Sequence, residues 1–494
     1  MDYLDPQKKR RKRNALMLMY VLIGIAISIA TVTLVYLING YSIDRNTGEV
    51  IQNGLIYVDS KPESAEVYLN GEKQKGRTDL RLVIPEGFYD IQMKRDGYRD
   101  WGRDIVLEGG SLRRLTYSRL VPNTIDSELA INLPIAPTLV TQSIDKRWVV
   151  MAFIDNPLQM RVVDLNKDQF ELVDLKLPLD LLDTKAAGSW EVIDWADDNK
   201  TFLAVYKTDT SNEYVLINRE DATKSKKLKS VFPTINYTEV SFFERKNDLV
   251  YLFDGTGKVL YKADVNDGRV ELVLNNVISY KTFGSDSVLY ITDLESEAGS
   301  VTARLKNGDK DYKLRTLKQD TKYLLDISKL GNDLVMGVGS PLENRVVIYN
   351  DPIGAIKQND FSDIPVPTTV LKIDNPEELS ISSDSSCIVV RGGQRIATHE
   401  FEADRSYAVQ IDAVPDPDQE IIWLDGQHLL FVSAGVQYMM DFDGSNQYDL
   451  MPTIASLSTV ANKDINFIYS FKQSDQPDAP VQMIRNFMRT KEDR

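Results

Sequence analysis

The pattern of apolar and polar positions divides the chain into segments of different spacing, and the first segment is continuously apolar. Residues 15–38 carry no charged side chain. As a helix they would extend about 36 Å at about 1.5 Å per residue, enough to cross about 30 Å of hydrocarbon. The hydroxyl groups of the run, that of Thr31 among them, can bond back to helix carbonyls. Tyr20 and Tyr36 lie near the two ends, where aromatic side chains favour the membrane interface. The run therefore predicts a transmembrane helix.

A basic run stands directly before this segment. Lys8–Arg13 consists of six positively charged residues. Positive charge flanking a first span keeps that side cytoplasmic. We therefore expect residues 1–14 to form a basic cytoplasmic tail. The protein would then be a single-pass protein of the plasma (inner) membrane, with the bulk of the chain extracytoplasmic.

A cleaved signal peptide is the competing interpretation of the amino terminus. The tripeptide Ser28-Ile29-Ala30 resembles a cleavage site of the small-x-small type. The apolar run continues to Ile38, well beyond that site, and this favours an uncleaved anchor.

After an expected linker over residues 39–53, apolar residues alternate with polar ones in short segments separated by turns. Asn70-Gly71 is a strong hairpin signal, and Asp96-Gly97 marks another turn. We expect a small β domain over residues 54–120, with no helix. Its strands are expected at Leu55–Val58, Ala65–Leu69, Leu80–Ile84, Tyr89–Met93, Ile105–Leu107 and Leu112–Tyr117.

The same residues resemble the PEGA domain family. The matching motifs are V-x-S-x-P from Val58 to Pro62, A-x-V-Y-L-N-G from Ala65 to Gly71, G-R-T from Gly76 to Thr78, I-P-E-G-F-Y from Ile84 to Tyr89, and D-G-Y-x-x-W from Asp96 to Trp101. The chain departs from the family at Phe88, where the family pattern has alanine. The resemblance implies a compact β-sandwich of surface and envelope proteins, used as a spacer or adhesive module rather than as a catalyst.

Residues 121–489 repeat a turn-and-strand pattern about eight times, and residues 490–494 follow as a charged tail. An acidic turn precedes an apolar strand in each unit, and the mean spacing of about 46 residues suits four-stranded propeller blades. The pattern predicts a β-propeller of eight blades, with seven as the alternative. The last unit needs a strand from elsewhere to close the ring, and residues 128–133 are the candidate. The turn aspartates are Asp145, Asp198, Asp248, Asp286, Asp333, Asp384, Asp425 and Asp464.

Two of these units resemble the TolB-type, WD-like propeller repeat, which reads roughly W-x-P-D-G-x-x-L-x-F. They run from Trp195 to Leu203 and from Trp423 to Phe431, and Tyr438–Asn446 resembles the later hairpin of that repeat. The other copies are degenerate. The expected fold class is therefore all-β with one amino-terminal transmembrane helix, a PEGA-like β-sandwich and a β-propeller.

Composition narrows the functions open to this chain. Lys plus Arg number 58 against 73 Asp plus Glu, for a net charge of −15. Residues 1–13 carry +4, which leaves −19 for the rest and argues against nucleic acid as a partner. One Cys excludes a disulfide scaffold and a zinc site of several thiolates. Two His leave little room for a histidine-based catalytic or metal cluster.

The few residues able to carry chemistry are scattered. His399 and His428 fall in different units, so neither a triad nor a metal site is expected, and His428 beside a turn is expected to be solvated. Cys387 begins an apolar strand and should be a small buried hydrophobe. The turn from Asp441 to Asp449 could wrap Ca²⁺, although a hairpin using Asp and Gly for backbone reasons is favoured. No catalytic, cofactor or metal residue is therefore assigned.

These features favour a membrane-anchored envelope protein without enzymatic activity. Its propeller would bind a protein or glycan partner, alone or within a larger envelope assembly. The alternative is an envelope polysaccharide hydrolase that uses carboxylates of the propeller channel. No G-x-S-x-G motif occurs, and no carboxylate pair stands out by spacing.

Overall fold

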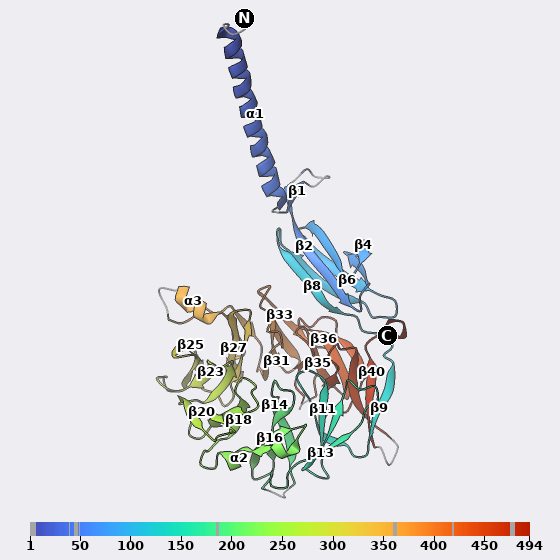
Figure 1. Ribbon diagram of the computed structural model, residues 1–494, viewed down its shortest axis with the longest axis vertical. Coiled ribbons are helices and arrows are strands. Elements are labelled where there is room, and N and C mark those ends of the chain that lie inside the picture. Colours follow the sequence, from blue (N-terminus) through green and yellow to red (C-terminus); the bar gives the residue numbers. More distant parts are fainter. Residues whose placement is uncertain are drawn as a thin grey trace. The chain divides into compact units, whose positions relative to one another are not determined.

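The computed structural model describes residues 6–38, 40–43, 48, 50–183, 187–358, 363–416, 419–474 and 480–494. The chain forms two compact units (Figure 1). One consists of Met1–Thr124 together with Lys491–Arg494, and the other of Ile125–Thr490. The two units are described in turn.

The first unit begins with helix α1, Pro6–Ile38. It starts well before the apolar run, because the basic residues that precede the run are themselves good helix formers. Within it Thr31 Oγ1 donates a 2.8 Å hydrogen bond to the carbonyl of Ile27, as expected for a hydroxyl in an apolar helix. Among the described residues this is the one helix long and apolar enough to cross a membrane.

The linker expected over residues 39–53 contains strands instead. Strand β1, Tyr41–Ile43, pairs antiparallel with the start of β2, Val50–Lys61. The amide of Asn53 also donates a 2.8 Å bond to the carbonyl of Gly40. The sheet therefore begins within a few residues of the helix, which alternation alone did not indicate because β1 is so short.

Two four-stranded sheets form the rest of this unit and confirm the expected β-sandwich. In one sheet β2 pairs with β1, β5 and β8, and in the other the order is β4-β3-β6-β7. Alternate residues of β2 and β7 face the core, where Ile56, Val67, Ile91 and Trp101 are fully buried. The remaining strands are β3 (Glu66–Leu69), β4 (Glu72–Arg77), β5 (Leu80–Pro85), β6 (Gly87–Lys94), β7 (Trp101–Leu107) and β8 (Leu112–Arg119).

The last residues of the chain belong to this unit and are more than a charged tail. They form a single 3₁₀ turn, Lys491–Asp493. The carboxylate of Asp493 accepts a 2.7 Å hydrogen bond from the hydroxyl of Tyr98 and forms an ion pair with Arg95. The carboxy terminus is thereby held beside the turn that follows β6.

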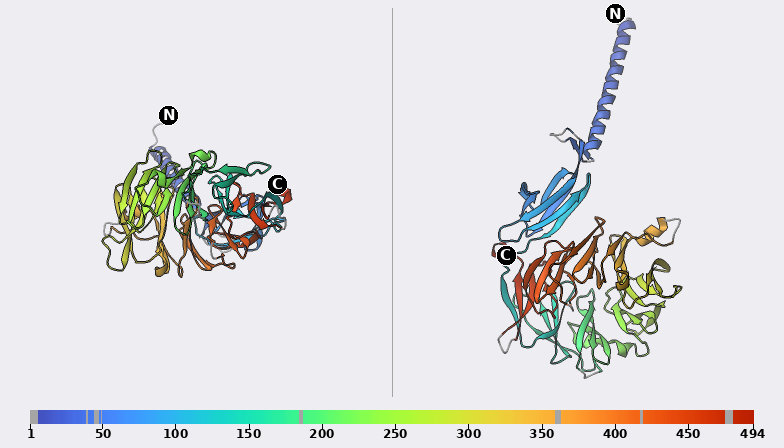
Figure 2. Two further views of the ribbon diagram at one scale, coloured as in Figure 1. Left: turned by 90° about the horizontal axis from the view of Figure 1, so that it is seen from below. Right: turned by 180° about the vertical axis from the view of Figure 1, so that it is seen from behind.

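The described residues of the second unit form eight four-stranded antiparallel sheets, which follow one another in chain order around a ring (Figures 1 and 2). Eight blades are therefore correct and seven are not. The blades are β10–β13 (Pro137–Gln142, Trp148–Phe153, Gln159–Asp164, Val173–Lys176), β14–β17 (Ser189–Trp195, Thr201–Lys207, Asn212–Asn218, Lys226–Lys227), β18–β21 (Glu239–Phe242, Leu249–Asp254, Val259–Asp264, Val270–Asn275), β22–β25 (Ser279–Phe283, Ser287–Thr292, Ser300–Asn307, Lys310–Lys318), β26–β29 (Leu324–Leu330, Asp333–Ser340, Arg345–Asn350, Thr369–Lys372), β30–β33 (Glu378–Ile381, Cys387–Gly392, Arg395–Glu400, Arg405–Gln410), β34–β37 (Ile422–Trp423, His428–Ser433, Val436–Asp441, Tyr448–Pro452) and β38–β40 (Val460–Ala461, Phe467–Gln473, Val481–Phe487) with β9 (Ser127–Leu133).

Strand β9 closes the ring, as expected for residues 128–133. It pairs antiparallel with β40, the last strand of the chain, so the eighth blade combines both ends of the propeller. Ser127 Oγ donates a 2.7 Å bond to Oδ1 of Asn486, and Glu128 forms an ion pair with Arg485. Opening the ring would break a whole strand pairing.

The core of the propeller lies between the blades. Every residue of β23, β31 and β35 is buried, because the second strand of a blade has neighbouring sheets on both faces. One cluster joins Val150 and Met160 of the first blade to Phe202 and Val215 of the second. This distribution explains why the sequence shows dispersed apolar strands rather than one long hydrophobic segment.

Candidate binding site in the propeller channel

First strands of neighbouring blades lie next to one another, as β10 does with β14 and β26 with β30, and side chains bridge such strands. Trp195 donates its indole N–H to Thr141 Oγ1 at 2.9 Å, and Trp423 donates to Ser380 Oγ at 3.0 Å. These are the two tryptophans of the units that resemble the TolB-type repeat. Each ends the first strand of its blade and reaches the preceding blade. They fix the inner strands that line the channel.

Other polar side chains continue this set of bridges around the channel. Arg245 Nε donates to Oδ2 of Asp194 at 3.0 Å, between the second and third blades. Gln142 Nε2 donates to the carbonyl of Ala461 at 2.7 Å, between the first and eighth blades. These bonds tie neighbouring blades together near the inner strands.

A cavity of about 560 Å³ opens among the inner strands β10 and β14, the seventh blade and the segment that leads into the eighth. It lies between the first two and the last two blades, so both ends of the propeller segment contribute to it. Its wall combines three carboxylates, two amides and four hydroxyls with an apolar surface. The lining residues are Leu139, Val140, Thr141, Glu191, Val192, Ile193, Asp194, Trp195, Gln419, Glu420, Ile422, Leu430, Phe431, Val432, Gln437, Ser456, Ser458 and Thr459.

Two of the three carboxylates of this wall have partners within the protein. Asp194 accepts from Arg245 and, at 2.8 Å, from the backbone N–H of Trp195. Glu191 forms an ion pair with Lys207. Both carboxylates are therefore already paired within the protein, Asp194 with Arg245 and Glu191 in a solvent-exposed pair with Lys207.

The amide of Gln437 is buried in the wall and is likewise paired within the protein. Its Nε2 donates a 3.0 Å bond to the carbonyl of Phe431, while its Oε1 accepts from Thr459. It therefore links the seventh blade to the segment that enters the eighth.

A second polar group lies on the inner strands of the third, fourth and fifth blades. Burial raises the pKa of Glu239 above its ordinary value, and the positive charge of Lys281 opposes this rise. Burial likewise raises the pKa of Asp326, again against the charge of Lys281 and against backbone N–H bonds from Ile381 and Ile327. One lysine thus partly compensates two carboxyl groups in this part of the channel.

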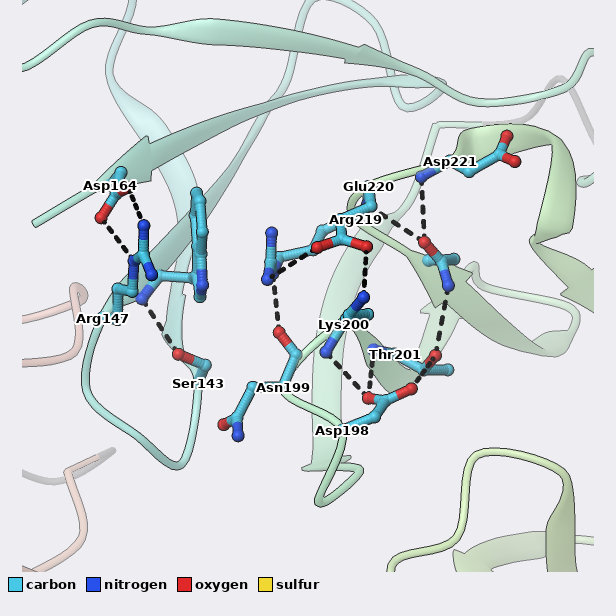
Figure 3. A network of polar contacts seen from close by, with 12 residues as sticks. Ser143, Arg147, Asp164, Asp198, Asn199, Lys200, Thr201, Arg219, Glu220 and Asp221 are labelled. Carbon is cyan, nitrogen blue, oxygen red and sulfur yellow. Dashed lines mark hydrogen bonds and ion pairs between the residues drawn. The ribbon is translucent and has the colours of Figure 1, made fainter.

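Of the turn aspartates that defined the repeat, Asp145, Asp198, Asp384 and Asp425 accept hydrogen bonds from backbone N–H groups of their own turns. All eight lie in or directly beside the turn between the first and second strands of a blade. Asp198 Oδ1 accepts from the backbone N–H groups of Lys200 and Thr201, both at 2.8 Å (Figure 3). Burial would raise the pKa of Asp198, but these bonds lower it below its ordinary value. Asp425 makes the equivalent bonds to its own turn.

Two arginines flank a tryptophan beside the first of these turns. The guanidinium carbons of Arg147 and Arg219 lie 4.6 and 3.7 Å from the ring centre of Trp148. Arg147 makes two hydrogen bonds to Asp164, at 2.9 and 2.7 Å, and this pairing lowers the pKa of that carboxyl (Figure 3). Arg219 donates to the carbonyl of Asn199 at 2.6 Å within the second blade, and its position over the Trp148 ring connects that blade to the first.

The histidines differ from expectation in their burial. His428 is buried rather than solvated, because its Nδ1 bonds to the turn carboxylate of Asp425 at 2.8 and 2.9 Å and its Nε2 lies 3.5 Å from Asp441. His399 is also buried, with Nδ1 3.0 Å from Ser406 Oγ.

Cys387 is buried, as expected for a small hydrophobe at the start of an apolar strand. In the turn weighed as a calcium site, Asp443 accepts from the backbone N–H of Ser445 at 3.1 Å and from its hydroxyl at 2.6 Å. Within the described ranges no three His, Cys, Asp or Glu residues are grouped so as to hold a metal ion. Through its two bonds to Ser445 the Asp443 side chain stabilises its own turn.

The lining residues of the cavity were not identified from sequence. Glu191 belongs to the second blade and Glu420 and Gln437 to the seventh, and the three residues share no motif. Their positions in the repeat could have indicated Glu191 and Asp194. Both precede the turn aspartate Asp198, in the segment that forms the innermost strand of the blade. The residues that precede the turn aspartate in each unit are therefore candidates for the channel wall.

Residues 53–118 match the PEGA domain family, as the motifs indicated. No curated protein matches the chain. Solved structures with a related fold include an uncharacterised protein of Listeria monocytogenes, with 13% identity, a TM-score of 0.40, and coverage of 66% of this chain and 91% of that one. The Cps50 (Swd1) β-propeller domain of Myceliophthora thermophila has 9% identity and a TM-score of 0.39, covering 74% of this chain and 100% of that one.

An oligogalacturonate lyase of Vibrio parahaemolyticus is similar at 11% identity with a TM-score of 0.36, covering 74% of this chain and 97% of that one. At these identities and TM-scores, the likeness carries no inference about activity or partner.

Proposed function

We propose that the chain is a single-pass protein of the plasma membrane with its bulk on the extracytoplasmic side. Helix α1 supports the anchor, because its apolar side chains from Leu16 to Tyr36 are exposed and would otherwise face water. The basic residues Lys8–Arg13 support the orientation, since positive charge beside a first span stays cytoplasmic. The part of the first unit that follows α1 is called the PEGA unit below. This unit and the propeller would then project from the outer surface of this membrane.

We further propose that the propeller is a binding module without enzymatic activity, and that its channel cavity takes a protein segment or a glycan. The observation that carries this is the mixed wall of the cavity, in which Ile422 and Val192 lie among carboxylates and amides. Such a wall suits a ligand with both apolar faces and hydrogen-bonding groups. Because Asp194 and Glu191 are held in ion pairs within the protein, binding is favoured over acid–base chemistry.

Protease accessibility tests the orientation. Protease added to cells whose outer layers have been opened should remove an epitope tag placed after Arg494. The same tag should be removed only after lysis if the bulk of the chain is cytosolic. Full protection of the tag in cells whose outer layers are opened but whose plasma membrane is intact would contradict the proposed orientation.

A pair of tryptophan substitutions tests the cavity. Ile422→Trp should place a bulky side chain in the cavity and reduce retention of the partner protein or of cell-wall glycan by the purified chain. Leu272→Trp, on the exposed outer strand β21, is the matched control and should leave retention unchanged. Equal retention by both variants would exclude the cavity as the site. Release of soluble glycan fragments, lost in Glu420→Gln, would instead favour the hydrolase.

A further inference from the structure

Exposed apolar side chains gather at the end of the PEGA unit where β2 begins. Leu55 on β2 pairs with Val83 on β5 and with Leu112 on β8, so the three side chains form an outward-facing row across the sheet. Val83 is 67% exposed and Leu112 45% exposed. The adjacent residue Ile56 faces the core, so this row is not part of the interior.

The opposite sheet adds two more apolar side chains at the same end. Phe88 on β6 pairs directly with Val106 on β7, and they are 63% and 47% exposed. Phe88 is the residue at which the chain departs from the alanine of the family pattern. Val50, at the start of β2, is exposed as well. We call Val50, Leu55, Val83, Phe88, Val106 and Leu112 the apolar end.

The apolar end is tied closely to the carboxy-terminal end of α1. Tyr41, three residues after the last residue of the helix, pairs with Gln52 of β2, and its ring lies 4.9 Å from that of Tyr36 in α1. Three residues span at most about 10 Å of chain. If α1 ends at the edge of the hydrocarbon, the headgroup layer extends on the order of 5–10 Å beyond that edge. The start of β2 lies within about this distance plus the spacing of one pair of strands.

We propose that the apolar end inserts into the outer surface of the bilayer that α1 crosses. This inference rests on the anchor proposed above. The turns at this end carry exposed carboxylates, Glu86 and Glu108, which disfavour attraction to anionic headgroups as the driving force. The contact is made instead by apolar side chains at the boundary between headgroups and acyl chains, as in other interfacial segments. It makes the PEGA unit a second membrane contact that restricts the tilt of the unit relative to the helix.

Spin labels in the full-length protein test this contact. The chain's one cysteine is replaced in Cys387→Ala, and a nitroxide is attached singly at Phe88→Cys or Val106→Cys in phosphatidylcholine vesicles. Glu63→Cys, exposed in the turn after β2, is the control at the other end of the unit. Val32→Cys reports on the helix itself. Collision with oxygen, which concentrates in lipid, is compared with collision with a polar nickel complex.

Labels at Phe88 and Val106 should collide more with oxygen than with the nickel complex, whereas the Glu63 label should show the reverse. The inference would be overturned if the labels at Phe88 and Val106 were as accessible to the nickel complex as the Glu63 label. If the Val32 label still reports lipid in that case, the anchor stands and only the PEGA contact fails. Spin–spin coupling between Phe88 labels of two copies would assign the apolar end to self-association and also overturn the inference.

Discussion

The indole of Trp195 donates a hydrogen bond to the hydroxyl of Thr141 across the boundary between two blades, at 2.9 Å. Both residues lie on innermost strands, and Trp195 is buried against Phe202 of its own blade. The bond therefore joins neighbouring blades where they line the channel. Trp423 and Ser380 repeat this relationship five blades further along the chain.

Removing the indole N–H should weaken this joint. Trp195→Phe is expected to lower the free energy of unfolding, in part through the lost bond and in part through lost packing. A double-mutant cycle with Thr141→Val isolates the bond, whose coupling should be about 0.5–1.5 kcal/mol. Denaturant unfolding of the protein in detergent measures it. Strictly additive effects of the two substitutions would show that the bond contributes nothing.

Closure of the ring depends on the side chains of β9 that pack into the core between the first and eighth blades. Leu133 is fully buried in the core between the first and eighth blades, whereas Leu129 on the same strand is exposed. Leu133→Ala should therefore cost about 2–5 kcal/mol of unfolding free energy through the cavity it leaves. Leu129→Ala should stay within about 0.5 kcal/mol of the parent. Equal losses in thermal or denaturant unfolding would mean that β9 does not close the propeller as described.

The repeat could be predicted from sequence because its signals are local. An aspartate such as Asp198 or Asp425 bonds to backbone groups two and three residues ahead, so the same residue types recur wherever that turn recurs. Counting these turns predicted eight blades, and the need to close the last blade predicted the role of residues 128–133. The PEGA unit was recognised for the same reason, since its motifs are short and contiguous.

What the sequence did not predict depends on contacts between distant residues. His428 is buried, and its Nε2 lies 3.5 Å from Asp441 on the neighbouring strand, which is not apparent from a position beside a turn. The contact of Asp493 with Tyr98 joins residues almost 400 positions apart. The channel wall likewise combines side chains such as Glu191 and Glu420 that become neighbours only when the ring closes.

Asp198 should contribute to stability through its turn bonds, whereas its neighbour Asp197 should not. Asp198→Ala removes the acceptor for the N–H groups of Lys200 and Thr201 and should cost about 1–2 kcal/mol of unfolding free energy, as for a lost cap. Asp198→Asn retains an acceptor oxygen and should recover much of that loss. Asp197→Ala is the matched control, since that side chain is exposed. A loss from Asp197→Ala as large as that from Asp198→Ala would show that charge, not turn bonding, matters here.

Buried His399 should make stability depend on pH. Burial lowers the pKa of His399 below its ordinary value of 6.5, and the carboxylate of Asp404, whose Oδ1 lies 3.7 Å from Nε2, opposes the effect. The folded protein therefore binds the proton more weakly than the unfolded chain. As the pH falls below about 6.5, the unfolded chain gains a proton that the folded chain lacks, so the free energy of unfolding decreases. The penalty is absent above that pH and stops growing once the folded-state pKa is reached.

Unfolding measured between pH 8 and pH 5 tests this dependence. His399→Gln removes the titrating group, so its loss of stability over that range should be smaller than that of the parent, by at most about 1.4 kcal/mol per pH unit. Asp404→Asn removes the opposing charge and should make the loss steeper, though only slightly because Asp404 is exposed to solvent. Parallel pH curves for the parent and His399→Gln would show that His399 titrates alike in both states, as an exposed histidine would.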